Sequence, residues 1–101
     1  MSLVFLIGAR RAGNSSLGRK LAEKLNFDFV DTDHHLAERL GAPVSYIVFK
    51  EGWDSFRRYE SQALKEASEG FRNRVLATGG GMVLAEANRD YMKKAGLVLY
   101  L

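Results

Sequence analysis

The spacing of apolar residues predicts strands that alternate with helices. Leu3–Ile7 is an unbroken apolar run that ends at Gly8, which is typical of a strand buried on both faces of a parallel sheet. Leucines then recur every four residues at positions 17, 21 and 25, with charged residues between them. This spacing predicts an amphipathic helix that begins at Ser15/Ser16 and ends near Asn26.

The rest of the chain continues this alternation, which predicts a single α/β domain over residues 1–101. Further strands are expected at residues 27–30, 74–77 and 97–101, and further helices at residues 34–40, 44–50, 55–69 and 85–94. Such an order indicates a parallel sheet covered by helices. We predict the strand order 2-3-1-4, with the strand at residues 3–7 in a central position.

A glycine-framed segment follows the first strand. Gly8-Ala-Arg-Arg-Ala-Gly13-Asn14-Ser15 has the frame of the phosphate-binding loop G-x-x-x-x-G-K-[ST], except that Asn14 stands where the lysine belongs. The glycines of such a loop let backbone N–H groups surround phosphate oxygens, and the start of the next helix adds partial positive charge. Ser15 stands where a hydroxyl holds Mg²⁺. The alternative is a tight strand-to-helix turn that requires glycine for its own geometry.

Two aspartates, Asp31 and Asp33, follow the second strand. Ligands of open parallel sheets gather at the carboxyl ends of the strands, where these side chains belong. Beside a phosphate site, one carboxylate can serve Mg²⁺ and the other a substrate hydroxyl. The alternative is an aspartate that caps the next helix. The neighbouring His34 and His35 diverge on a helix, so we do not expect both to reach one metal ion.

Two further segments carry candidate binding groups. Arg57 and Glu60 lie three residues apart on one helix face, where a glutamate can hold an arginine fork that binds a carboxylate. The alternative is a surface ion pair worth less than about 1 kcal/mol. Three consecutive glycines at 79–81 carry a high entropic cost, which is justified if a ligand lies directly on the backbone. The alternative is a flexible loop.

Composition narrows the choice of function. The chain has 101 residues, 47% of them hydrophobic and 27% charged, as in ordinary globular domains. It contains no cysteine, which excludes disulfides and thiolate metal sites. The net charge of +3 comes from scattered pairs of basic residues, so neither a nucleic acid nor a membrane is the expected partner. The short apolar run at residues 3–7 does not resemble a signal peptide, and we expect the cytosol as the location.

These segments, taken together and in this order, resemble the shikimate kinase family over residues 3–101. The motifs that support this resemblance are the glycine-framed loop, Asp31-Thr-Asp33, the E-G-x-x-x-F-R-x-x-E run from Glu51 and the triple glycine. The stretch at residues 77–83 and the Gly-Ala-Arg opening of the loop resemble the enteric type II form. The resemblance implies a three-layer fold of the P-loop NTPase type. It also implies an enzyme that uses ATP and Mg²⁺ to phosphorylate the 3-hydroxyl of shikimate in aromatic amino-acid biosynthesis.

The resemblance further implies a role for each matching residue. Asp33 binds ring hydroxyls and is the candidate catalytic base, Arg57 binds the shikimate carboxylate, and Glu60 orients Arg57. Gly79, Gly80 and Gly81 lie along the substrate, while Ser15 and Asp31 support Mg²⁺. The implied nucleotide-binding residues are Gly8, Ala9, Arg10, Arg11, Ala12, Gly13, Asn14, Ser15 and Ser16.

The chain departs from the family pattern in two places. Asn14 offers a hydrogen bond but no charge, and losing one positioned electrostatic donor typically slows a reaction on the order of a hundredfold to a thousandfold. Family members also continue beyond the position of Leu101, through a lid with further arginines, a fifth strand and an adenine-contacting loop. We therefore expect a partial domain, truncated before the fifth strand, with impaired activity and an exposed strand at 97–101 that pairs with another copy. The alternative function is a non-catalytic shikimate-binding module.

Overall fold

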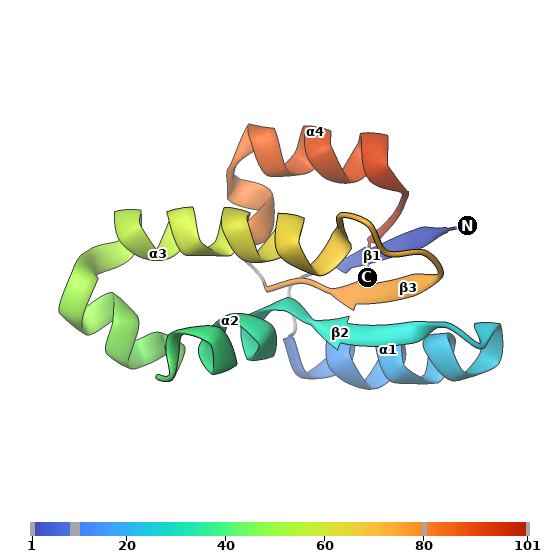
Figure 1. Cartoon of the computed structure of the whole chain (residues 1–101), viewed down its shortest axis with the longest axis horizontal. Coiled ribbons are helices and arrows are strands. Elements are labelled where there is room, and N and C mark those ends of the chain that lie inside the picture. The colour runs from blue at the N-terminus through green and yellow to red at the C-terminus, as the bar shows by residue number, and fades with distance from the viewer. Residues whose placement is uncertain (1, 9–10, 80, 101) are drawn as a thin grey trace.

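The elements of the fold follow the predicted alternation of strands and helices. The computed structural model describes residues 2–8, 11–79 and 81–100, without the side chains of residues 11–15. In chain order the elements are β1 (Leu3–Ile7), α1 (Arg11–Leu25), β2 (Asp28–Asp31), α2 (Thr32–Leu40), α3 (Val44–Ser68), β3 (Arg74–Ala77), the 3-10 turn η1 (Met82–Leu84), α4 (Glu86–Ala95) and β4 (Leu97–Tyr100) (Figure 1). Of the helices that the structure describes, none is both long and apolar enough to cross a lipid bilayer.

The four described strands form one sheet in the order β2-β3-β1-β4. β1 pairs in parallel with β3 and β4, and β2 pairs in parallel with β3. The predicted strand order and the central position of β1 are therefore confirmed. The apolar character of β1 follows from this position, because a central strand of a parallel sheet is covered on both faces.

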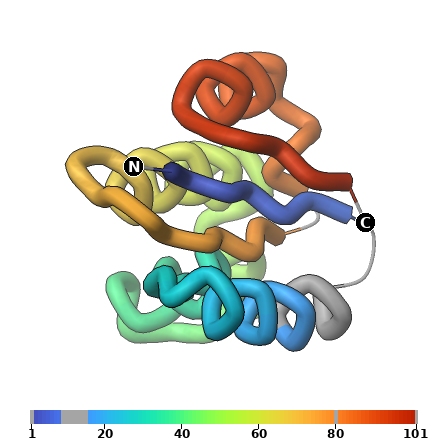
Figure 2. The backbone as a smooth tube through the Cα atoms, turned by 90° about the vertical axis from the view of Figure 1, so that its right-hand side faces the viewer, coloured from blue at the N-terminus to red at the C-terminus, as the bar shows by residue number. Residues whose placement is uncertain are grey.

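Helices cover the two faces of the sheet, so the fold has the predicted three layers. α1 lies on one face, and α3 and α4 lie on the other (Figure 2). The side chains of β1 alternate between the two resulting cores, as the period of a strand requires. Phe5 and Ile7 pack against α3 and α4, while Val4 and Leu6 pack on the side of α1.

Only one of the three predicted leucines of α1 packs against the core on this face of the sheet: Leu21, which is partly buried. Leu17 and Leu25 are 45% and 43% exposed, whereas Ala22 is buried. Gly18 lies one turn before Ala22, and a Cβ atom built there would stand 2.5 Å from Cε1 of Phe29 on β2. Small residues thus let α1 lie close against the sheet, and the leucines at its two ends remain exposed.

α3 joins the two helices predicted at residues 44–50 and 55–69, and Gly52 marks the break between them. Gly52 has φ 86° and ψ 168°, a conformation that glycine adopts at little cost and other residues avoid. The part of α3 before Gly52 packs with α2, through a cluster that includes Leu36 and Ile47, and projects beyond the sheet (Figure 1). The part after Gly52 returns to the sheet and buries Leu64 against it.

Candidate functional site

The carboxyl ends of β1, β2 and β3 lie side by side at one edge of the sheet. In the register of the sheet, Ala77 pairs with both Leu6 and Asp31. Two threonine hydroxyls continue this alignment past the strand ends: Thr32 Oγ1 donates to the Ala77 carbonyl at 3.3 Å, and Thr78 Oγ1 donates to the Leu6 carbonyl at 3.0 Å. Gly8, Thr32 and Thr78, which follow these three strands, therefore lie at one edge of the sheet.

The glycine-framed loop begins at this edge with Gly8. Ala9 and Arg10 lie outside the described residues, as do the side chains of Arg11, Ala12, Asn14 and Ser15. α1 begins at Arg11 rather than at Ser15/Ser16, so the predicted start of this helix is wrong. Arginine and alanine are good helix formers, and the first-turn N–H groups of a helix need no intrahelical partner, so the extension costs little. Ser16 is exposed in the second turn of α1.

Asp31 and Asp33 lie at the carboxyl end of β2 but make different contacts. Asp31 is the N-cap of α2, and its Oδ1 accepts hydrogen bonds from the Asp33 and His34 backbone N–H groups at 3.0 and 3.2 Å. The capping alternative therefore holds for Asp31. The cap also fixes the first turn of α2, which carries Asp33 to the edge of the sheet beside the glycines that follow β3.

Two of the three glycines after β3 leave room for the candidate binding side chains. A Cβ atom at Gly79 would stand 2.5 and 2.6 Å from the two carboxylate oxygens of Asp33. A Cβ atom at Gly81 would overlap Nη1 of Arg57. Gly80 lies outside the described residues. The lack of side chains here serves the close approach of Asp33 and Arg57, which brings a carboxylate and a guanidinium to the same short segment.

Arg57 and Glu60 form an ion pair that is not a simple surface pair. Arg57 Nη1 donates to Glu60 Oε1 at 2.7 Å, and the side chains are 35% and 3% exposed respectively. Glu60 is therefore buried under the guanidinium, which remains partly open to solvent. An arginine held in this way keeps further N–H donors for a ligand, because a guanidinium carries five.

Burial raises the pKa of Glu60 above its ordinary value, and the nearby charge of Asp33 raises it further. The hydrogen bond from Arg57 and its positive charge oppose this shift. The carboxylate of Glu60 thus depends on Arg57 for its charge compensation. Removing the arginine would leave a buried carboxylate with a second acidic group nearby, a costly arrangement.

Two side chains beside Arg57 were not identified from the sequence. The guanidinium carbon of Arg57 lies 4.9 Å from the centroid of the Trp53 ring, and the four-residue spacing of this pair on a helix could have revealed it. Asn88 and Gly81 help to line a groove of about 350 Å³ along Arg57, and Asn88 Nδ2 donates to the Met82 carbonyl at 3.1 Å. No spacing in the sequence points to Asn88, because its place depends on the turn η1.

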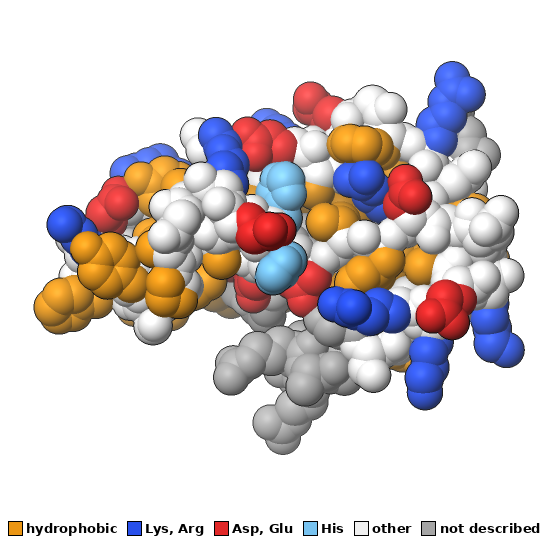
Figure 3. All heavy atoms as spheres, turned by 60° about the horizontal axis from the view of Figure 1, so that its bottom comes forward, with side chains coloured by type: hydrophobic (Ala, Val, Ile, Leu, Met, Phe, Trp, Pro, Cys, Tyr) orange, Lys and Arg blue, Asp and Glu red, His pale blue; other side chains and the backbone are white. Residues whose placement is uncertain are grey.

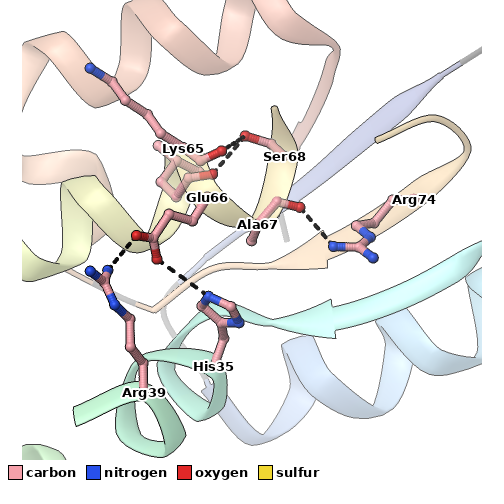
Figure 4. Close-up of polar contacts among 8 residues, drawn as sticks. His35, Arg39, Lys65, Glu66, Ala67, Ser68 and Arg74 are labelled. Atoms are coloured by element: carbon pink, nitrogen blue, oxygen red, sulfur yellow. Dashed lines mark hydrogen bonds and ion pairs between the residues drawn. The ribbon is translucent and has the colours of Figure 1, made fainter. Parts of the chain in front are cut away.

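The two histidines contact different acidic side chains. Figure 3 shows them on a face that also carries acidic side chains. His34 Nε2 is 3.2 Å from Glu38, whereas His35 Nε2 is 3.6 Å from Glu66, which also pairs with Arg39 (Figure 4). Over the described part of the chain, no group of three or more histidine or acidic side chains is arranged to hold a metal ion.

The order of the sheet and the glycine-framed segment after its central strand place the chain among the P-loop α/β proteins. A family model described as shikimate kinase matches residues 10–101. The chain belongs to the shikimate kinase family.

Individual relatives agree with this assignment. The chain is 43% identical over 99 residues to shikimate kinase 2 of Photorhabdus laumondii and 48% identical over 98 residues to shikimate kinase 2 of Dickeya chrysanthemi. These matches cover 98% and 97% of the chain. The chain also superimposes on the shikimate kinase of Acinetobacter baumannii solved in complex with shikimate, with a TM-score of 0.94, 39% identity and all of its own length covered.

The chain spans little more than half the length of these relatives. It covers 56% of both curated proteins and 56% of the Acinetobacter baumannii chain. A gluconokinase of Sinorhizobium meliloti, 19% identical with a TM-score of 0.59, is similar in fold alone. The likeness to shikimate kinases therefore concerns the part of those proteins that contains the sheet edge described above.

Proposed function

We propose that the chain is a shikimate kinase-like protein, which acts by transfer of the γ-phosphoryl group of ATP to the 3-hydroxyl of shikimate. The observation that carries this proposal is the meeting of Asp33 and the Arg57–Glu60 pair over the glycines that follow β3. The family assignment supports it. The proposal includes a role in aromatic amino-acid biosynthesis in the cytosol.

The substrate half of the site provides complementary groups for a small hydroxylated acid. Arg57 binds the shikimate carboxylate through the donors that Glu60 does not use, in a charge-assisted contact. Asp33 accepts hydrogen bonds from ring hydroxyls and takes the proton of the hydroxyl that receives the phosphoryl group. Gly79, Gly80 and Gly81 let the ring lie against the backbone.

The glycine-framed loop forms the nucleotide half of the site, and residues 8–16 bind ATP and ADP. Hydroxyl and carboxylate oxygens suit Mg²⁺, which Ser15 and Asp31 would hold together with the phosphates. Mg²⁺ supplies charge neutralisation at the phosphates when bound. Asn14 lacks the charge of the family lysine, and turnover of the chain is accordingly reduced.

The presence of Asn14 at the lysine position also supports a second function. With Asn14 at the lysine position and the substrate groups intact, the chain can bind shikimate without transferring a phosphoryl group. In that case shikimate binds with the same affinity whether or not ATP and Mg²⁺ are present. In a working kinase, the two ligands share one site and the binding of one changes the affinity for the other.

Calorimetric titration with shikimate, with and without ATP and Mg²⁺, tests the proposal and separates the two functions. Arg57→Ala should weaken shikimate binding at least tenfold, because a charge-assisted contact is worth about 1.5–3 kcal/mol. Arg72→Ala is the matched control, since Arg72 is exposed and lies just before the amino end of β3, at the opposite edge of the sheet. Equal affinities of the Arg57 variant and the unmodified chain would reject the site.

A further inference from the structure

Trp53 stands immediately after the break in α3. Gly52, with its φ of 86°, ends the first helical part, and Trp53 lies in the first turn of the second part. Its side chain is 57% exposed, and neighbouring positions of the projecting part of α3 carry the exposed aromatic residues Tyr46 and Phe49. Figure 3 shows apolar side chains gathered at this end of the molecule. An indole that is mostly exposed contributes little to a core, so packing alone does not explain its position.

The indole lies beside the guanidinium of Arg57, one helical turn further on. The Arg57 guanidinium carbon is 4.9 Å from the centroid of the Trp53 ring and 5.6 Å from that of Phe56. The two rings contact one another edge to face, with their centroids 5.9 Å apart. A cation within about 6 Å of an aromatic centroid is attracted by the ring, and tryptophan gives the strongest such contact.

Arg57 is thereby held by an ion pair and by two aromatic rings. Glu60 accepts its Nη1 hydrogen bond at 2.7 Å, the Trp53 and Phe56 rings lie beside the guanidinium, and Gly81 provides the space that a side chain would fill. A single hydrogen bond at one nitrogen leaves the guanidinium plane free to turn about that bond. The aromatic contacts remove this freedom and leave the remaining donors in a defined direction.

We infer that Trp53 is a positioning residue for ligand binding, which holds the Arg57 guanidinium in the orientation that receives a carboxylate. The inference rests on the proposed function, in which Arg57 binds the carboxylate of a small hydroxylated acid. Pre-organisation of a flexible side chain improves affinity because less conformational freedom is lost when the ligand binds. Trp53 acts through Arg57 and does not itself need to touch the ligand.

The replacement of Trp53 by leucine tests the inference, since leucine keeps an apolar side chain but has no aromatic face. Trp53→Leu should weaken shikimate binding about two- to fivefold in calorimetry, the effect of one partly exposed cation–π contact. Trp53→Phe should recover most of the loss, because it restores a ring. Phe49→Leu is the matched control and should leave the affinity unchanged, because Phe49 is an aromatic residue of the same helix that is 88% exposed. Thermal unfolding of each variant verifies that the fold is kept.

Measuring shikimate affinity of Trp53→Leu in an Arg57→Ala background shows whether Trp53 acts through Arg57. With the guanidinium removed, Trp53→Leu should cause no further loss, whereas a direct contact between Trp53 and shikimate would still cause one. A loss that persists in this background, or unchanged affinity of Trp53→Leu alone, would overturn the inference and leave the proposed function standing. Absence of shikimate binding by the unmodified chain would instead reject the proposed function, and the inference with it.

Discussion

Replacing Gly79 by alanine should displace Asp33 while leaving the backbone undisturbed. The φ angle of Gly79 is not in the left-handed region, so alanine can adopt the local conformation. Its methyl group, however, would stand 2.5 Å from Asp33 Oδ1 and 2.6 Å from Oδ2. The conflict is therefore between one methyl group and the carboxylate that the proposed function assigns to the ring hydroxyls.

The distances give the size of the effect. Ordinary van der Waals contact begins near 3.4 Å, so Asp33 must retreat by about 0.9 Å, the difference between 3.4 and 2.5 Å. A hydrogen bond to a charged group contributes about 1.5–3 kcal/mol, and a displacement of this size removes most of it. Shikimate affinity should fall about ten- to a hundredfold.

Calorimetry on the unmodified chain, Gly79→Ala, Asp33→Ala and the double variant measures this coupling. In the Asp33→Ala background the methyl group meets no carboxylate, so Gly79→Ala should cost little further affinity. Gly70→Ala serves as a glycine control, because its φ of 78° strains the backbone while a new Cβ there has nothing within 4 Å. It should lower the unfolding temperature and leave affinity unchanged. Wild-type affinity of Gly79→Ala, or an equal loss with and without Asp33, would refute the reasoning.

Three further predictions concern the nucleotide loop, the buried carboxylate and the edge of the sheet. Asn14→Lys should strengthen ATP binding, because it restores a point charge at the phosphates; an unchanged ATP affinity of this variant in calorimetry would contradict this. The pKa of Glu60 in the folded protein is raised from its ordinary value of 4.5. The folded chain therefore binds this proton more tightly than the unfolded chain does, and stability falls as pH rises through the interval just above 4.5. The difference in unfolding free energy between the unmodified chain and Glu60→Gln should therefore decrease over this interval in urea titrations, and a flat difference would show that burial does not govern this group. β4 is an edge strand of the described sheet, so sedimentation of the 101-residue polypeptide should find a dimer that Leu97→Lys, at a position 59% exposed, converts to a monomer. A monomeric unmodified chain at high concentration would exclude this pairing.

The strands could be predicted because apolar runs report burial directly, whereas their order came with the P-loop fold that the family resemblance implies. Leu3–Ile7 is apolar at every position, as a central strand of a parallel sheet requires. The orientation of α1 was predicted less well. Residues spaced by four drift around a helix of 3.6 residues per turn, so a leucine at every fourth position does not mark one constant face. The close fit of Gly18 against Phe29 decides which side meets the sheet, and spacing carries no information about it.

The candidate site could be predicted where its groups are adjacent in sequence, and less where the fold brings them together. The Arg57–Glu60 pair follows from a three-residue spacing on one helix. The approach of Asp33 to Gly79 does not, because it depends on the register of β2 against β3 and on the cap that Asp31 provides. The break at Gly52 was predicted only as a gap between two helices, because spacing along the chain does not give the change of direction that the positive φ of Gly52 produces there.

The groups that the proposed function assigns to the carboxylate lie in one short stretch of α3. The guanidinium, its carboxylate partner and its aromatic neighbours all lie within residues 53–60, after Gly52. The glycine-framed segment leads into a different helix, α1, which lies on the opposite face of the sheet (Figure 2). Substitutions in the glycine-framed segment can therefore change the proposed nucleotide site without altering the groups that the proposed function assigns to the acid.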